Sequence, residues 1–212
     1  PRHRAGRRND GMSQLTVRFW GVRGSLATPG AKTARYGGNT SCVEVQAGDE
    51  RIVFDMGSGL RELGAALRGT KDLRITFFLS HYHWDHILGL PFFAPAFDPT
   101  ATLVIHGATR LGKSVREILA GQMINPYFPV GLGEMFASLQ FRGVESGARV
   151  PVGDAVVTIR ELNHPGGALG FRIDRGEHSV VYATDFEHGT SADDVLADLA
   201  QGADVLIYDA TY

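Results

Sequence analysis

The stretch His81-Tyr-His-Trp-Asp-His86 places four potential metal ligands within six residues. His81 and His83 are two positions apart, so in an extended segment both side chains point to the same side. Asp85 and His86 follow where the chain is expected to turn into a helix, and such a turn would direct both toward a second point beside the first. The stretch could therefore serve two metal ions at the spacing of roughly 3.5–4 Å that two-metal sites show.

The alternative is a polar loop whose histidines only cap a helix or pack against neighbours. That would suit a single histidine, but here three histidines and an aspartate follow the apolar strand expected over 74–79. Concentrating so many ionisable groups in one place costs stability unless something binds them, so we predict a metal site. Imidazole and carboxylate ligands suit zinc, manganese or iron, and no thiolate accompanies them to narrow the choice.

Short strands separated by glycine-rich segments surround this stretch, and together they predict one layered α/β domain. Helical spacing of apolar residues predicts helices over 60–67 and 115–123, and Ser191 is expected to cap a third that runs to about residue 200. The predicted strands cover 16–20, 42–46, 51–55, 74–79, 103–105, 156–162, 170–173, 179–183 and 205–208. We expect the last of these strands to lie in the core.

The composition is that of a globular protein, with 43% hydrophobic and 21% charged residues among 212. The longest apolar stretches have the length of strands, so no membrane partner is expected. The first dozen residues lack the apolar region of a secretory signal. Cys42 is the only cysteine, which rules out a disulfide within this chain and fits the cytoplasm, the location we predict.

The charge is uneven along the chain. Residues 1–11 carry four arginines and one aspartate, a net charge of +3, whereas the whole chain carries −2. This basic leader could contact nucleic acid, but we interpret it as a flexible end or a remnant of cloning that precedes Met12. The remainder, 12–212, is predicted to be a single domain, and its net charge of −5 argues against broad electrostatic capture of long nucleic acid.

The spacing His81-x-His83-x-Asp85-His86 resembles the central motif of the metallo-β-lactamase superfamily. Further positions follow the superfamily's pattern in chain order: Asp55-Met-Gly57, His164 and Asp185. The segments 21–25, 36–42 and 208–212 resemble the phosphodiesterase-like branch, whose members include PhnP, ribonuclease Z and cyclic-nucleotide phosphodiesterases. The resemblance runs from about residue 16 to residue 212.

This resemblance implies a fold and a set of site residues. The fold would be α/β, a four-layer αβ/βα sandwich of the metallo-β-lactamase type with metals at one edge of two packed sheets. Asp55 would orient the ligand loop from behind. Asp85 and Asp185 would act in catalysis. The implied metal ligands are His81, His83 and His164 for a first ion, Asp85 and His86 for a second, and Asp185 as the bridge between them.

The implied function is that of a metal-dependent hydrolase with two divalent ions, zinc before manganese or iron. We predict a phosphodiesterase that acts through a metal-bridging hydroxide positioned by Asp185. A thioester or lactam hydrolase of the same fold, and a metal-binding regulatory module with little turnover, remain open as alternatives. The expected partner is a small phosphodiester or nucleotide; RNA and a homo-oligomeric assembly are also open.

Two positions depart from the family pattern. The superfamily normally supplies one more histidine to the second metal after the last predicted strand, and none follows here. We therefore expect the natural protein to continue past Tyr212, with the C-terminal part of the fold absent from this chain. Ribonuclease Z has a histidine near the position of Tyr208, and the tyrosine weakens that specific assignment.

Three further features leave alternatives open. Arg23 and Ser25, between glycines, could meet a phosphate or simply form a tight turn. Residues 125–129 could line a substrate pocket or form a surface loop pinned by aromatic side chains. His188, three residues past Asp185, is interpreted as a loop residue in preference to a substrate contact.

Overall fold

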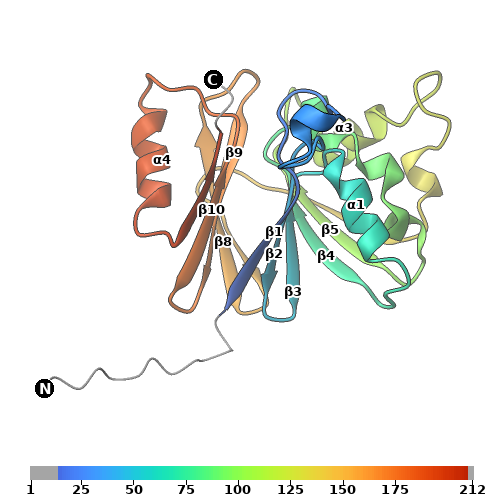
Figure 1. Ribbon diagram of the computed structural model, residues 1–212, viewed down its shortest axis with the longest axis horizontal. Helices are drawn as coiled ribbons and strands as arrows, with labels where there is room; N and C mark the ends of the chain where they lie inside the picture. The colour runs from blue at the N-terminus through green and yellow to red at the C-terminus, as the bar shows by residue number, and fades with distance from the viewer. Residues whose placement is uncertain (1–13, 210–212) are drawn as a thin grey trace, which may run out of the picture.

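Two β-sheets packed face to face form the centre of the molecule, with helices on both outer sides (Figure 1). This computed structural model describes residues 14–209, so the predicted leader at 1–11 lies outside the described residues. From one outer side to the other, the layers are α4, the second sheet, the first sheet, and a group of helices that includes α1 and α3. The prediction of a four-layer α/β sandwich is confirmed.

The first sheet has the strand order β1-β2-β3-β4-β5-β6. Strands β1 to β3 pair antiparallel, and β3 to β6 pair parallel. Its strands are β1 (Leu15–Gly21), β2 (Cys42–Ala47), β3 (Glu50–Phe54), β4 (Arg74–Phe78), β5 (Thr102–Gly107) and β6 (Ser138–Gly143).

The second sheet has the order β11-β10-β9-β8-β7 and is antiparallel except for the β10–β11 pair. Its strands are β7 (Arg149–Val152), β8 (Ala155–Leu162), β9 (Ala168–Arg175), β10 (His178–Ala183) and β11 (Val205–Tyr208). The helices are α1 (Gly59–Ala66), α2 (Trp84–Ile87), α3 (Val115–Gly121) and α4 (Ala192–Ala200), with short 3₁₀ turns at Ala31–Thr33, Leu90–Phe92, Ala94–Phe97 and Leu132–Glu134.

Consecutive phenylalanines in β4 show why the sheets are covered on both faces. Phe77 packs under the helices of the first sheet, whereas Phe78 points into the space between the two sheets, and both are fully buried. Side chains alternate along a strand, so a continuous apolar strand requires a cover on each side. Between the sheets, the Phe54 ring stacks on Tyr182 with centroids 4.9 Å apart. A third cluster joins α4 to the outer face of the second sheet.

The structure corrects the placement of the last strand. β11 lies at the edge of its sheet, and Val205 and Leu206 are 40% and 47% exposed, so the prediction that it lies in the core was wrong. Four apolar residues in a row look alike in a central and an edge strand, but β11 pairs only with β10 within the described residues. Only Ile207 packs toward the core between the sheets.

Two smaller differences concern local structure. Strands β6 and β7 were not predicted, because both are partly exposed and β7 contains a proline, which edge strands tolerate. Ser191 does not cap α4 with its side chain; the Thr190 hydroxyl accepts the Ala192 amide instead. Within the part of the chain that is described, no helix has the length and apolar character needed to cross a membrane.

Candidate metal centre

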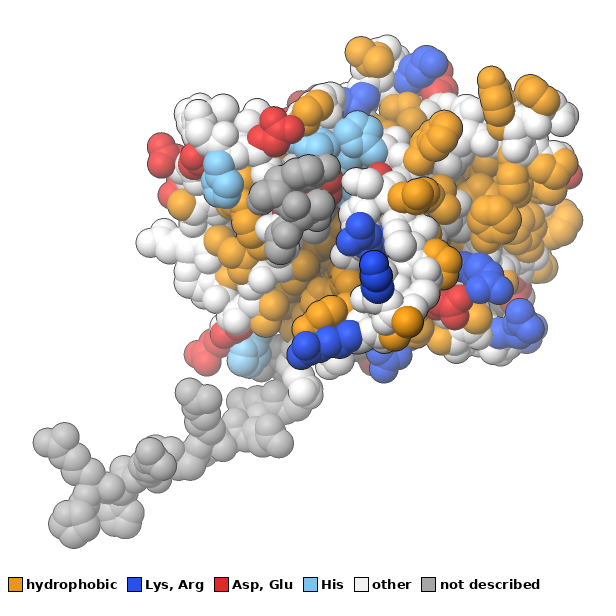
Figure 2. Space-filling view, turned by 45° about the horizontal axis from the view of Figure 1, so that its top comes forward, with side chains coloured by type: hydrophobic (Ala, Val, Ile, Leu, Met, Phe, Trp, Pro, Cys, Tyr) orange, Lys and Arg blue, Asp and Glu red, His pale blue; other side chains and the backbone are white. Residues whose placement is uncertain are grey.

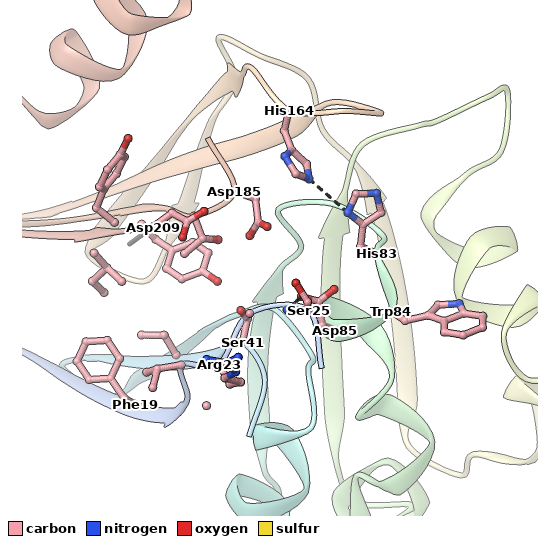
Figure 3. A pocket seen from close by; sticks show the side chains of 18 of the residues that line it. Phe19, Arg23, Ser25, Ser41, His83, Trp84, Asp85, His164, Asp185 and Asp209 are labelled. Atoms are coloured by element: carbon pink, nitrogen blue, oxygen red, sulfur yellow. Dashed lines mark hydrogen bonds between the residues drawn. The ribbon is translucent and has the colours of Figure 1, made fainter. Parts of the chain in front are cut away.

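All six predicted ligands lie at one edge of the sandwich, where strands of both sheets end. Asp55 follows β3, and the segment 81–86 follows β4, which is parallel to β3 and ends beside it. His164 follows β8 and Asp185 follows β10, both from the second sheet. Figure 3 shows His83, His164, Asp85 and Asp185 around one hollow between the sheets, and Figure 2 shows histidine side chains reaching the surface there.

Three histidines form the first group of potential ligands. His81 Nε2 lies 2.9 Å from His83 Nδ1, and His164 Nε2 lies 3.3 Å from the same atom. Zinc–nitrogen distances of about 2.0–2.1 Å in a tetrahedral site place ligand atoms roughly 3.3 Å apart. The three nitrogens therefore have the mutual spacing that one bound ion would require.

The second group consists of His81, His86 and Asp185, whose ligand atoms lie within 4.8 Å of one another. Asp185 Oδ2 is 3.1 Å from His86 Nε2, and Asp85 Oδ2 is 3.4 Å from it. His81 thus belongs to both groups, which places the two groups side by side. The residues present could therefore hold metal ions at two neighbouring positions.

His86 shows that the second group fits a metal ion. Its Nε2 atom is buried and makes no hydrogen bond to any residue of 14–209, although two carboxylate oxygens lie within 3.4 Å of it. Both distances are short enough for ion pairs if His86 is protonated. Buried polar atoms without partners are rare and costly. An ion placed among Nε2 and the two carboxylates would satisfy all three groups.

Asp55 anchors the ligand segment 81–86 through hydrogen bonds on the side facing the protein interior. It is fully buried, and its Oδ1 accepts the Ser80 amide at 2.7 Å. Its Oδ2 accepts His86 Nδ1–H at 2.8 Å and the Tyr182 hydroxyl at 2.6 Å. Because His86 donates through Nδ1, the lone pair of Nε2 is left for a metal, as carboxylate–histidine pairs behind metals usually arrange. The Ser80 hydroxyl lies 3.0 Å from His81 Nδ1 and can accept its N–H, which would leave the Nε2 lone pair of His81 for a metal.

The pKa values divide the histidines into two kinds. Burial and the neighbouring His86 lower the pKa of His81 to about 3, and burial lowers the pKa of His164. Burial would also lower the pKa of His86, but the carboxylates of Asp55 and Asp185 raise it well above its usual value. His81 and His164 are therefore neutral and able to bind a cation. In the second group the carboxylates favour a positive charge beside them, which either a proton on His86 or a metal ion would supply.

The segment 21–25 supports the site through its backbone. The Ser25 amide donates to Asp85 Oδ2 at 2.8 Å, and Ser25 has a φ of 66°, so the tight turn is confirmed. Burial would raise the pKa of Asp85, but His86 and this amide lower it overall. Gly57 packs against the same residue: a Cβ there would lie 2.2 Å from the Asp85 carbonyl oxygen. Glycine is therefore required at that position.

A cavity of about 1080 Å³ opens beside the centre. Arg23 and Trp84 line it, together with Asp85, His83, His164 and Asp185. His188 does not line it, but lies 3.1 Å from Asp193 and contacts the Tyr208 hydroxyl, which confirms the interpretation as a loop residue. Residues 125–129 also lie outside its lining and form a surface loop in which Tyr127 is 82% exposed.

Sequence reasoning missed two residues of the site, Ser80 and Tyr182, and it missed the role of the Ser25 amide. Ser80 and Tyr182 both donate hydrogen bonds to Asp55, which orients the potential ligand His86. The Ser25 amide donates to the potential ligand Asp85. Tyr182 lies in an apolar strand whose alternation indicates only core packing. Its polar role depends on where the second sheet sits relative to Asp55, and no local pattern encodes that position.

Comparisons with known proteins agree with this geometry. The family described as the beta-lactamase superfamily domain matches residues 50–212. An uncharacterised protein of Mycobacterium leprae is 30% identical over 164 residues, which cover 76% of this chain and 55% of that protein. Ribonuclease Z of Pyrococcus furiosus is 31% identical over 138 residues, covering 62% of this chain and 42% of the enzyme.

Solved structures share the fold. The metallo-β-lactamase fold protein YhfI of Bacillus subtilis superposes with a TM-score of 0.67 and 21% identity, covering 93% of this chain and 71% of that protein. The present chain spans about half the length of the curated relatives that it matches. The region shared with the family contains all six predicted ligands. The chain therefore belongs to the metallo-β-lactamase superfamily.

Proposed function

We propose that this protein is a hydrolase that uses two divalent metal ions to cleave phosphodiester bonds. The observation that carries the proposal is the pair of adjoining ligand groups that share His81. In the second of them, His86 Nε2 is buried and has no hydrogen-bond partner among the described residues. When bound, two such ions would activate water near neutral pH and stabilise negative charge on the phosphate. The proposed metals are zinc first, with manganese or iron as alternatives, because imidazole nitrogens predominate among the ligands.

The proposed roles of the residues follow from their positions. His81, His83 and His164 would hold the first ion, and His86, Asp85 and Asp185 the second, with Asp185 between the two. The side chain of Asp185 is 25% exposed and lines the cavity, so one of its oxygens could accept a proton from attacking water. Burial of Asp55 and His86 keeps bulk water away from the rear of the centre.

Two observations favour a phosphodiester over a thioester or a lactam. A ribonuclease Z is among the relatives at 31% identity, and a phosphodiester is the bond that such an enzyme's name implies. Arg23, the one lysine or arginine among the described residues that line the cavity, supplies a cation suited to a phosphate.

An activity panel tests the proposal. Protein loaded with zinc or with manganese is offered bis(p-nitrophenyl) phosphate, cyclic nucleotides, a short RNA and a β-lactam. We expect hydrolysis of at least one phosphodiester and its loss after chelation. His178→Ala serves as the control, because this exposed histidine lies at the start of β10 and lines no part of the cavity.

The outcomes separate the alternatives. Hydrolysis of the β-lactam alone would replace the proposal with a lactamase. Two bound metal ions without turnover on any substrate would favour a metal-binding module. Absence of bound transition metal, even after reconstitution, would remove the basis of all these functions.

A further inference from the structure

Trp84 is an exposed residue in a segment whose neighbouring residues are held by hydrogen bonds. It lies between the potential ligands His83 and Asp85, at the first position of α2, and lines the cavity with its side chain 80% exposed. Its backbone is fixed on both sides: the His83 carbonyl accepts the His86 amide at 2.9 Å, and the Trp84 carbonyl accepts the Leu88 amide at 2.8 Å. The backbone of Trp84 is therefore anchored beside two potential ligands, and its exposed indole points away from Asp85 and Asp185 (Figure 3).

Arg23 lies on the other side of Asp85 from Trp84 (Figure 3). Its backbone is also fixed, because its amide donates to the Asn39 carbonyl at 2.9 Å and it forms a β-bridge with Thr40. Its side chain is exposed, and no carboxylate forms an ion pair with it within residues 14–209. The guanidinium is therefore available to a ligand in the cavity.

The charges of the cavity show what Arg23 would attract. Four carboxylates line it, those of Asp85, Asp185, Glu187 and Asp209. Asp85 and Asp185 lie beside the potential ligand His86, whereas Arg23 is the one lysine or arginine among the described residues that line the cavity. A phosphate held at the metal ligands would not occupy the Arg23 guanidinium, which could then bind a second phosphate through paired hydrogen bonds.

We propose that the cavity binds a nucleic-acid strand across the metal centre, with a nucleobase stacked on Trp84 and a neighbouring phosphate on Arg23. The proposal rests on the proposed function and names its substrate class: a strand with at least two phosphates. Every nucleobase has an aromatic face, so stacking on Trp84 would tolerate any sequence. The strand would run from the helix-covered side of the first sheet, where Trp84 lies, toward the segment 21–25.

Binding measurements test the two contacts separately. The ligands are a short oligoadenylate with phosphorothioate linkages and an abasic strand of the same length and linkages, each labelled with fluorescein for anisotropy on the zinc-loaded protein. We expect Trp84→Ala to weaken binding of the adenylate strand about tenfold or more, and that of the abasic strand less than twofold. Arg23→Gln should weaken both alike and reduce the salt dependence of binding by about one phosphate contact.

A spectroscopic measurement and two control variants complete the test. The chain contains two tryptophans, so Trp20→Phe leaves Trp84 as the only indole, whose fluorescence the adenylate strand should quench and the abasic strand should not. Phe136→Ala and Arg116→Gln remove an exposed ring and an exposed guanidinium outside the cavity lining, and should leave both affinities unchanged.

Each outcome bears on one proposal or the other. Equal binding of the two strands, or full binding by Trp84→Ala, would overturn the stacking contact, and unchanged salt dependence in Arg23→Gln would overturn the phosphate contact. Hydrolysis of a chromogenic phosphodiester, measured in parallel, reports on the proposed function alone. Base-dependent binding without any hydrolysis would keep this inference and contradict the phosphodiesterase.

Discussion

The Tyr182 hydroxyl donates a hydrogen bond to Asp55 Oδ2 at 2.6 Å, although the two residues lie 127 positions apart, Tyr182 in the second sheet and Asp55 directly after strand β3 of the first. The same oxygen accepts His86 Nδ1–H at 2.8 Å. The second sheet therefore helps to orient a potential metal ligand that the first sheet carries.

Tyr182→Phe should weaken metal binding and leave the fold intact. The ring would still stack on Phe54, but Asp55 would lose one of the bonds that hold it toward His86. Removing a hydrogen-bond partner of the residues that orient a metal ligand lowers metal affinity roughly 10- to 100-fold. The loss of a hydrogen bond to a charged group lowers the free energy of unfolding by about 1.5–3 kcal/mol. Metal titration and thermal unfolding measure the two effects, with the exposed Tyr36→Phe as the control. Unchanged metal affinity would show that Tyr182 only packs.

His83→Ala should empty the first ligand group. Its Nδ1 lies within 3.3 Å of both other histidine nitrogens, so its removal leaves two ligands where three converge. Elemental analysis of the purified variant should find about one metal ion fewer per chain, whereas His178→Ala should keep the full content. A variant that retained both ions would place the first site elsewhere.

Asp185→Asn should lower turnover by orders of magnitude with little loss of folding. The side chain keeps its shape but loses the charge proposed to hold two cations together. The residue has a φ of 56°, and asparagine tolerates this left-handed conformation as well as aspartate does. Steady-state kinetics and circular dichroism measure the two properties, with the exposed Asp194→Asn as the control. Near-normal turnover would exclude Asp185 as the bridge.

The two ligand groups should respond differently to pH. The raised pKa of His86 means that a proton occupies it near neutral pH when no metal is bound, and this proton must leave before Nε2 can bind an ion. Metal affinity at the second group should therefore rise with pH, up to about tenfold per pH unit below that pKa. The lowered pKa values of His81 and His164 predict neutral ligands and a much flatter dependence at the first group.

Calorimetry in two buffers of different ionisation enthalpy counts the protons released at each step of metal uptake. The first ion should release few protons and the second about one, so each site serves as the control for the other. Equal proton release at both steps would contradict the proposed protonation of His86.

Gly57→Ala should disrupt the site by overpacking. The added methyl group would lie 2.2 Å from the Asp85 carbonyl oxygen and 2.5 Å from the Thr40 hydroxyl. We expect a loss of about 1–3 kcal/mol of stability, as for other overpacked positions, together with weaker metal binding. Gly121→Ala, at the end of α3 with open space around it, is the matched control and should be neutral or stabilising. Full stability of Gly57→Ala would show that the loops shift freely.

The ligand stretch and the layered fold could be predicted from the sequence, because both depend on neighbouring residues. Two histidines at a spacing of two point the same way in any extended segment, and the apolar run at 74–79 can only be buried on both faces. The later ligands His164 and Asp185 followed only from the family pattern. Strand β11 looked central for a related reason: its four residues carry no mark of which sheet edge they occupy.

Contacts between distant segments were decided by the tertiary structure alone. The bond from Tyr182 to Asp55, the sharing of His81 between two ligand groups, and the Ser25 amide on Asp85 all join segments that no local pattern relates. Periodicity along the chain determines the side of a strand or helix on which a residue lies. Periodicity does not determine which residues contact each other between the two sheets. Those contacts depend on how the sheets pack on a shared core, and they join side chains more than a hundred positions apart.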